Sequence, residues 1–205
     1  MSKERAGVRS KREKKSTYIA KIAARLFSKK GFLETSINDI AKFTKMSKAN
    51  IYYYFEDKNY LLTYILNEFF DTILSETEIY SRNDITWEDK LKIFIKRHVD
   101  IYVENTPQAK VLFREVNNLD PRNRKLMRQK ERKYFEILRE IVSGYLGDSA
   151  SKEDVTALSF FILGACNWMY LWYDPKKKIT PERISEMIFQ VFKNGIASLK
   201  TNSAS

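Results

Sequence analysis

The sequence predicts an all-α fold of about nine helices. Apolar residues recur at spacings of three and four along most of the 205-residue chain, and no convincing alternation of apolar and polar residues predicts a strand. Hydrophobic residues make up 43% of the chain and aromatic residues 14%, which suits a packed core and excludes a disordered chain. The four prolines each fit a first helical turn or a connecting loop.

The first helices follow a basic arm. Residues 1–14 are polar and basic, so we expect them to be disordered. We expect a helix over residues 16–30, which Gly31 ends. Thr35 or Ser36 can cap a second helix that reaches residue 42, and Ser47 can cap a third from residue 48 to about residue 55. Later helices are expected at residues 58–80, 87–104, 107–119, 121–146, 152–173 and 181–199.

The charge divides the chain into two parts. Residues 1–60 hold 15 Lys or Arg against 6 Asp or Glu, whereas residues 61–205 hold 22 against 20. We therefore expect two domains, residues 1–60 and residues 61–205, of which the first binds a polyanion such as nucleic acid. The alternative is a solubilising tail, because Lys3 to Lys15 alone carries seven basic residues.

Composition excludes several classes of protein. The single cysteine, Cys166, leaves no internal disulfide framework, and the single histidine, His98, leaves no metal site with paired His ligands. Gly-rich phosphate loops and the GxSxG motif are absent, and no nucleophile, base and orienting group can be assembled. We therefore expect a binding protein and not an enzyme, with no metal and no cofactor.

Residues 155–173 carry no charge over nineteen positions, a length that can span a bilayer. The stretch contains Ser159 and Asn167 as well as large aromatic residues, so a helix buried in a soluble core or interface explains it better. The basic N-terminus is not followed by the apolar segment of a secretory signal. We expect a cytoplasmic protein with no membrane contact.

Residues 43–46 join two short helices in a helix-turn-helix pattern, in which the second helix enters the major groove of duplex DNA. Ile51, Tyr54 and Phe55 share the side of that helix that can pack inward. The outward side offers an ammonium, a methyl group and two phenols, which suit phosphates, thymine methyl groups and guanine edges, and an amide that suits adenine. The expected DNA-binding residues are Thr35, Ser36, Ser47, Lys48, Ala49, Asn50, Tyr52, Tyr53 and Lys58. For Thr35 and Lys58 the alternatives are a helix cap and a surface charge.

Residues 35–61, TSINDIAKFTKMSKANIYYYFEDKNYL, resemble the DNA-binding signature of the TetR family of one-component transcriptional regulators. The preceding AKIAARLFSKKGF resembles the first helix of that family. The resemblance implies a homodimer that reads both half-sites of a palindromic operator in double-stranded DNA and represses promoters until a ligand binds. The turn has Thr44 and Lys45 where the family has a small Ala-Gly pair, which leaves its backbone conformation open.

Residues 164–184, GACNWMYLWYDPKKKITPERI, are similar to a segment of TetR regulators of fatty-acid and steroid degradation. This similarity implies a sensor of acyl-CoA thioesters, with an unrelated hydrophobic ligand, such as that of an efflux repressor, as the alternative. An acyl-CoA needs an apolar tunnel for its chain and cations for its phosphates. The expected ligand-binding residues are Phe94, His98, Tyr102, Phe113, Arg128, Arg132, Tyr134, Asn167, Trp168 and Trp172. The alternatives are a solvated basic face, ordinary core aromatic residues and a satisfied interior histidine.

The last two helices are strongly apolar and can form half of an intersubunit four-helix bundle. The expected interface residues are Val155, Leu158, Ile162, Cys166, Ile184, Ile188, Val191 and Phe192. A non-specific DNA-binding protein is the remaining alternative for the whole chain.

Overall fold

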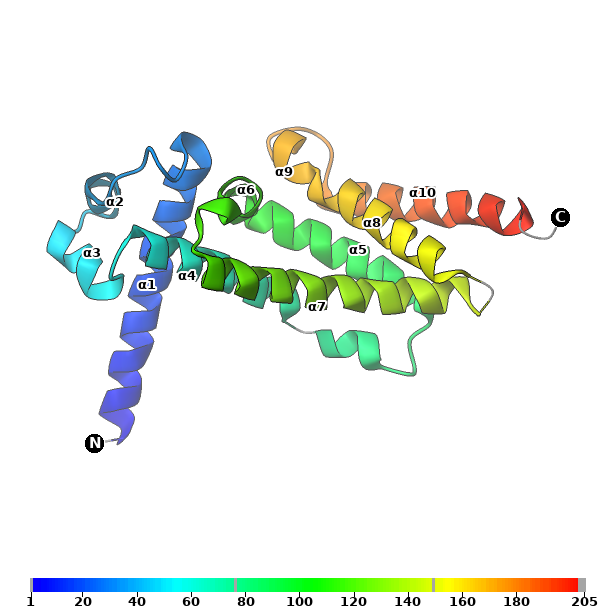
Figure 1. Ribbon diagram of the computed structural model, residues 1–205, viewed down its shortest axis with the longest axis horizontal. Helices are drawn as coiled ribbons and strands as arrows, with labels where there is room; N and C mark the ends of the chain where they lie inside the picture. Colours follow the sequence, from blue (N-terminus) through cyan, green and yellow to red (C-terminus); the bar gives the residue numbers. More distant parts are fainter. Residues whose placement is uncertain (1, 76, 149, 203–205) are drawn as a thin grey trace. The chain divides into compact units, whose positions relative to one another are not determined.

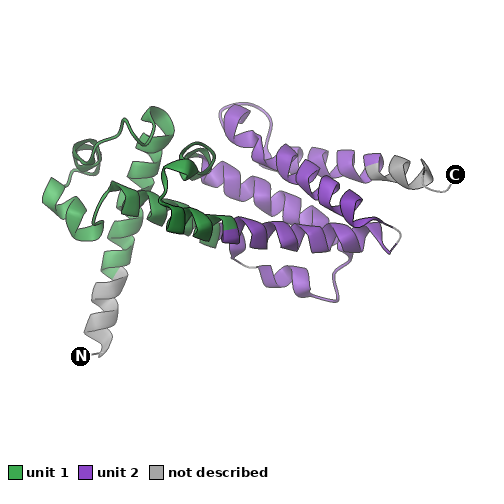
Figure 2. Cartoon of the chain, viewed as in Figure 1, with its two compact units in different colours: residues 1–71, 107–128 green, residues 72–106, 129–205 purple. Residues whose placement is uncertain are grey.

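The computed structural model describes the backbone of residues 2–75, 77–148 and 150–202, and the side chains of residues 11–75, 77–148 and 150–195. These residues form the α-helices α1 to α10 and two short 3₁₀ helices, η1 and η2, with no strand among them (Figure 1). The predicted all-α fold is confirmed. By contact the chain divides into two compact units, which Figure 2 distinguishes by colour.

Unit 1 consists of residues 1–71 and 107–128. The sequence predicts a first domain of residues 1–60. Unit 1 continues to residue 71 and also includes residues 107–128. Its elements are α1 (Ser2–Lys30), α2 (Ile37–Thr44), α3 (Lys48–Tyr54), most of α4 (Lys58–Leu74), α6 (Thr106–Glu115) from Pro107 onward, η2 (Val116–Asn118) and the start of α7 (Pro121–Leu146).

The expectation that residues 1–14 are disordered is wrong for the described part of the arm, because α1 begins at Ser2. Residues 2–15 contain no proline and are rich in Lys, Arg and Glu, which have high helix propensity, so the helix extends beyond the core. Met1 lies outside the described residues. The other end of α1 is as predicted, since Gly31 has φ 96° and donates its N–H to the carbonyl of Phe27 at 2.8 Å.

The core of unit 1 is assembled from α1, α2, α3 and α4. Phe27, Ile40 and Ile51 have no exposed surface, and Phe55 is 1% exposed. The apolar residues of α4 complete this core. α4 ends at Leu74, earlier than predicted, and η1 (Thr77–Ser81) follows. After the last residue of α4, the Ser75 hydroxyl donates a hydrogen bond to the carbonyl of Thr72 at 2.8 Å, which competes with continuation of the helix.

Unit 2 consists of residues 72–106 and 129–205. It holds η1, α5 (Trp87–Glu104), the larger part of α7, α8 (Lys152–Asn167), α9 (Met169–Trp172) and α10 (Pro181–Asn202). α5 packs against α8, α9 and α10. Thr86 and Ser151 cap α5 and α8 by accepting hydrogen bonds from the N–H groups of Asp89 and Asp154.

The uncharged stretch of the sequence is divided between α8 and α9. By length and composition alone, Lys152–Trp172 resembles a membrane span. α8 has 16 residues and is therefore about 24 Å long, which is short of the roughly 30 Å hydrocarbon core of a bilayer. Within α8, the Ser159 side chain is buried and donates to the carbonyl of Val155 at 2.7 Å. This helix does not indicate a membrane protein.

Candidate functional site

The first helix of the predicted helix-turn-helix, α2, begins with a capping box. The N–H of Asp39 donates to Ser36 Oγ at 3.1 Å, and the N–H of Ser36 donates to Asp39 Oδ2 at 2.9 Å. These hydrogen bonds, with a smaller contribution from nearby Lys30, lower the pKa of Asp39. Ser36 is exposed and acts within the protein as the cap of α2.

The turn between α2 and α3 closes without a glycine. Lys45 has φ 57° and ψ 37°, in the left-handed region, where a non-glycine residue costs roughly 1–2 kcal/mol. The N–H of Met46 donates to the carbonyl of Ala41 at 3.0 Å, and the buried Thr44 hydroxyl donates to the carbonyl of Ile40 at 2.8 Å. The conformation that the sequence left open is therefore a left-handed cap at Lys45.

The second helix, α3, has one buried and one exposed side. Ser47 caps it by accepting from the N–H of Asn50 at 3.1 Å, and Ile51 and Phe55 anchor it in the core. The opposite side presents basic, aromatic and amide side chains to solvent, and Tyr53 is 65% exposed there. The exposed residues of this side are Lys48, Ala49, Asn50, Tyr52 and Tyr53, and we call them the outward face of α3.

Cations lie against both exposed tyrosines of the outward face. The Lys48 ammonium is 5.9 Å from the ring centroid of Tyr52, and the Arg12 guanidinium is 5.5 Å from that of Tyr53. Arg12 belongs to the arm of α1, which sequence reasoning treated as disordered. The residue was missed because its contact joins parts of the chain forty positions apart.

Thr35 and Lys58 have roles that differ from the expected phosphate contacts. The Thr35 side chain is fully buried, and its hydroxyl donates to the carbonyl of Gly31 at 2.8 Å. The Lys58 ammonium donates to the carbonyls of Phe32, Leu33 and Thr35 at 2.8, 3.2 and 3.0 Å. All three N–H groups of the ammonium are thus used inside the protein. Within the chain, these side chains hold the loop between α1 and α2, and their expected contacts with phosphates stay predictions.

A short helix anchored by two buried side chains, following a tight turn and presenting a basic and aromatic outer face, defines a helix-turn-helix DNA-binding protein. Residues 19–65 match the family model for bacterial regulatory proteins of the tetR family, and residues 84–196 match that for the tetracyclin repressor-like C-terminal domain. The chain belongs to the TetR family and is a DNA-binding transcriptional repressor.

Three similar proteins illustrate this membership. The HTH-type transcriptional repressor KstR2 of Rhodococcus jostii (strain RHA1) is 20% identical over 185 residues, 89% of this chain and 91% of that protein. The crystal structure of a TetR-family transcriptional regulator from Bordetella parapertussis 12822 has a TM-score of 0.81 and 25% identity, covering 86% of this chain and 93% of that chain. The crystal structure of AibR in complex with isovaleryl coenzyme A and operator DNA has a TM-score of 0.73 and 24% identity, covering 86% and 97%.

Unit 2 contains a hydrogen-bonded group of three side chains from three helices. His98 of α5 has its Nδ1 atom 3.0 Å from the Tyr134 hydroxyl and its Nε2 atom 3.0 Å from Asn167 Oδ1. Because Oδ1 only accepts, Nε2 carries the proton and the Tyr134 hydroxyl donates to Nδ1. Burial lowers the pKa of His98 to about 4, which the bond to Asn167 opposes. The imidazole is neutral, and both of its nitrogen atoms are satisfied.

Aromatic rings fill the space around this group. His98 and Tyr102 stack with centroids 4.2 Å apart, and Phe94 and Tyr134 stack at 4.9 Å. Burial raises the pKa of both tyrosines. The structure therefore brings together five of the expected ligand-binding residues, and it brings them together as a closely packed core. His98 has the satisfied interior position that the sequence left as its alternative.

The other expected ligand-binding residues lie elsewhere. Phe113 and Arg128 are exposed residues of unit 1, and Arg132, Trp168 and Trp172 are exposed residues of unit 2. A cleft of about 740 Å³ in unit 2 lies between Trp87, the C-terminal half of α7 and the start of α8, and no expected ligand-binding residue lines it. Among the described residues, no group of three or more His, Cys, Asp or Glu side chains is placed to hold a metal ion.

The expected dimer-interface residues divide by exposure. Val155, Ile162, Cys166 and Ile184 are buried within the chain, and Val191 is 70% exposed. Leu158, Ile188 and Phe192 are half-buried. Burial raises the pKa of the Cys166 thiol to about 12, so it stays protonated as a small apolar side chain.

Proposed function

We propose that this TetR-family protein is a cytoplasmic homodimer that represses transcription by binding a palindromic operator and is released by a small-molecule ligand. The observation that carries the proposal is the outward face of α3. It exposes donors for phosphates and base edges, with apolar surface for thymine methyl groups, on a helix fixed from behind by Ile51 and Phe55. A face with two exposed tyrosines is costly to leave in water, and DNA would cover it.

Operator selection from a random duplex library, followed by binding to the selected palindrome and to its scrambled sequence, tests the DNA-binding proposal. A specific repressor favours its operator by at least ~10³-fold. Tyr53→Ala lowers operator affinity by roughly 1–3 kcal/mol, because a base contact of the ring or hydroxyl is lost. Equal affinity for both duplexes contradicts specific recognition and leaves a non-specific DNA-binding protein.

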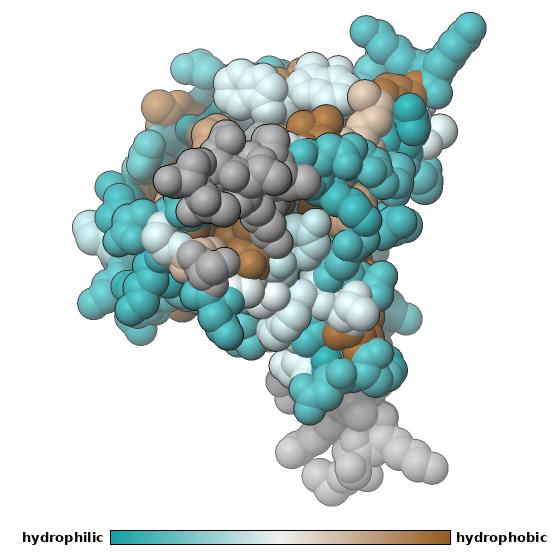
Figure 3. Space-filling view, turned by 90° about the vertical axis from the view of Figure 1, so that its right-hand side faces the viewer, coloured by the Kyte–Doolittle hydropathy of each residue, from teal (hydrophilic) through white to brown (hydrophobic). Residues whose placement is uncertain are grey.

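The proposed dimer uses an exposed apolar face on α8 and α10. Much of the surface is hydrophilic, as on the face in Figure 3. A group of neighbouring exposed apolar side chains therefore indicates a surface that binds a partner. Phe160, Phe161 and Trp168 are 60%, 67% and 62% exposed, at helical spacing with the small residues Gly164 and Ala165 between them. On α10, Met187 and Val191 are 46% and 70% exposed. A second copy that packs on this face completes a four-helix bundle.

Sedimentation measurements on three variants test the dimer. Phe161→Glu and Val191→Glu place a charge in the proposed interface, which costs several kcal/mol when the partner buries it, so both proteins become monomers. Leu33→Glu is the matched control, because it adds the same charge at a residue of unit 1 that is 72% exposed. Dimers in all three variants would place the interface on another surface. Ile162→Glu is a poorer choice, since Ile162 is buried in the chain's own core.

The proposed ligand is a long-chain acyl-CoA, which links the repressor to genes of lipid metabolism. Two observations support it: the similarity of residues 164–184 to regulators of fatty-acid and steroid degradation, and AibR, a protein of the same fold that binds isovaleryl coenzyme A. Within unit 2, the apolar rings around Tyr134 suit an acyl chain, and the exposed guanidinium of Arg132 suits a phosphate. The alternative is an unrelated hydrophobic ligand, such as an efflux substrate.

Titration of a preformed protein–operator complex with acyl-CoA of increasing chain length tests the ligand. A coupling of ~1–3 kcal/mol between the two sites weakens operator binding roughly 5–150-fold. We expect long-chain acyl-CoA to do this, while free coenzyme A and short-chain acyl-CoA do not. If no thioester releases the DNA, the acyl-CoA proposal fails and the repressor remains.

A further inference from the structure

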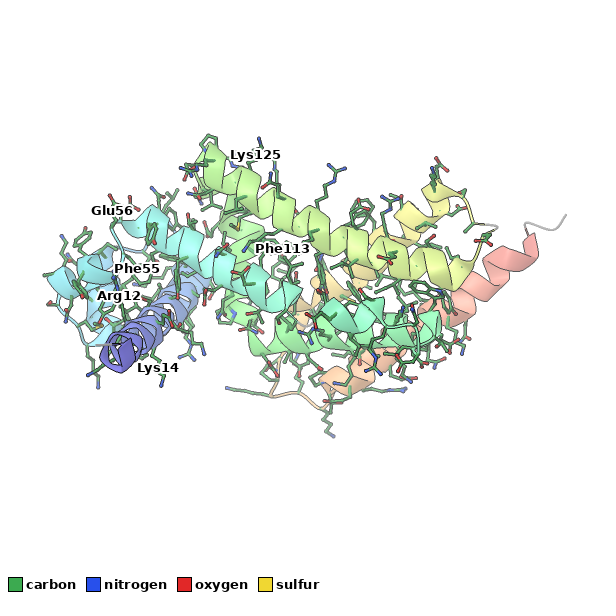
Figure 4. All side chains as sticks on the ribbon, turned by 90° about the horizontal axis from the view of Figure 1, so that it is seen from below. Arg12, Lys14, Phe55, Glu56, Phe113 and Lys125 are labelled. Atoms are coloured by element: carbon green, nitrogen blue, oxygen red, sulfur yellow. The ribbon has the colours of Figure 1, made fainter. Side chains whose placement is uncertain are left out.

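The arm of α1 brings a cation to the edge of the outward face of α3. The guanidinium of Arg12 lies over the ring of Tyr53 at 5.5 Å, and Tyr53 is the most exposed tyrosine of that face. Figure 4 shows Arg12 on the side of α1 toward Phe55, which follows α3, with Lys14 directed to the other side. The two basic residues of one helical turn thus have different surroundings.

The helical period explains this difference. Residues 12, 16, 19 and 23 share one face of α1, and on that face Ile19 and Ala23 have no exposed surface. Arg12 therefore continues the inward-facing side of α1 one to two turns beyond the core, where it reaches α3 and not the solvent alone. Lys14 lies on the opposite side, in line with the exposed Tyr18 and Lys21.

We propose that Arg12 is a residue of the DNA-binding surface that positions the ring of Tyr53 and contacts a backbone phosphate beside it. The inference rests on the proposed operator binding. It adds a particular residue of α1 to an interface whose expected contacts were named only between Thr35 and Lys58.

A guanidinium suits both parts of this role. It is planar, so it can stack on the tyrosine ring and restrict the orientation of that side chain while its N–H groups point outward. Those N–H groups match two oxygens of a phosphate, whereas an ammonium acts as a point charge. When DNA covers the pair and excludes water, the attraction between cation and ring strengthens.

The first measurement is the affinity of Arg12→Ala for the selected operator at several salt concentrations, with Lys14→Ala as the matched control. Both variants lose one positive charge from the same helix. We expect Arg12→Ala to weaken binding at least tenfold and to reduce the slope of log affinity against log salt by about two phosphate contacts per dimer, one from each protomer. Lys14→Ala keeps the slope, because its side chain faces away from α3.

The second measurement separates positioning from charge. If Arg12 acts partly through Tyr53, the loss in Arg12→Ala/Tyr53→Ala is smaller than the product of the two single losses, by about fivefold. Arg12→Lys keeps the charge and the salt slope, but it loses part of this coupling with Tyr53. A residue that only stabilises the fold would change the melting temperature and leave the salt slope unchanged, so circular dichroism and melting curves accompany each variant.

The outcomes are distinct. Equal behaviour of Arg12→Ala and Lys14→Ala overturns the inference, and so do independent effects of Arg12 and Tyr53. Binding to scrambled duplex is measured in parallel, because a phosphate contact of Arg12 is visible there too. A wild-type protein without preference for the operator contradicts the proposed function, while the Arg12 comparison still decides the inference.

Discussion

Replacing Lys58 by methionine should destabilise the protein, although lysine at the start of a helix is usually a surface residue. The Lys58 ammonium donates to the carbonyls of Phe32, Leu33 and Thr35, and it lies 4.4 Å from the ring centroid of Phe32. Methionine keeps most of the apolar stem of the side chain and removes the three donors. The change therefore isolates the hydrogen bonds.

The magnitude follows from the number and kind of bonds. Hydrogen bonds to a charged group contribute about 1.5–3 kcal/mol each, but three that share one half-buried ammonium are far from additive. We expect a loss of about 2–3 kcal/mol, since water can reach part of the freed carbonyls. For a chain of this size that corresponds to a decrease of roughly 5–10 °C in melting temperature.

Thermal and urea unfolding of Lys58→Met, with Lys48→Met as the control, measure the effect. Lys48 is exposed on the outward face of α3, so its replacement should change stability by less than about 0.5 kcal/mol. Operator affinity of the two variants is measured against salt concentration. An unchanged melting temperature for Lys58→Met, together with a salt slope reduced by about two phosphate contacts per dimer, would refute the reasoning.

Three further predictions concern backbone strain, close packing and pH. Lys45→Gly should be more stable than Lys45→Ala by roughly 0.5–1 kcal/mol in urea unfolding, because only glycine adopts the left-handed conformation without strain; equal stabilities would contradict this. Gly144→Ala should cost about 1–3 kcal/mol, since its Cβ would overlap the Trp87 indole, whereas Gly195→Ala, whose Cβ would meet no described atom within 4 Å, should not destabilise. The pKa of His98 is about 4 in the folded protein and higher when unfolded, so its contribution to stability is complete above pH 6.5 and decreases as the pH falls toward 4. The wild type should lose about 2 kcal/mol more than His98→Gln between pH 7 and pH 5, and equal losses would show that His98 does not titrate on unfolding.

The helices and the two sides of α3 could be predicted from the sequence because they depend on local spacing. Ile51 and Phe55 are four residues apart, so both pack on one side of the helix and leave Tyr52 and Tyr53 on the exposed side. The caps at Ser36, Ser47 and Ser151 also depend on residues three positions apart.

The positions of the aromatic residues in unit 2 could not be predicted in this way. Ring size and hydrophobicity are the same for a pocket wall and for a filled core. Only the stacking of Phe94 on Tyr134 and the bonds from His98 to Asn167 and Tyr134 distinguish the two. These partners come from three different helices, so no spacing along the chain predicts them.

The sequence alone also does not show which basic residues contact DNA. In the folded chain, this depends on whether other acceptors already bind the N–H groups of each side chain. Lys58 and Arg12 are both basic residues of unit 1, and the sequence singled out only Lys58 as a contact of DNA. In the folded chain, three backbone carbonyls accept hydrogen bonds from the Lys58 ammonium, whereas the Arg12 guanidinium lies over the ring of Tyr53 at 5.5 Å. A cation that carbonyls already satisfy has little to gain from a phosphate. A guanidinium that lies over a ring can still donate its N–H groups to a phosphate, so of these two residues Arg12 is the one that we expect the operator to contact.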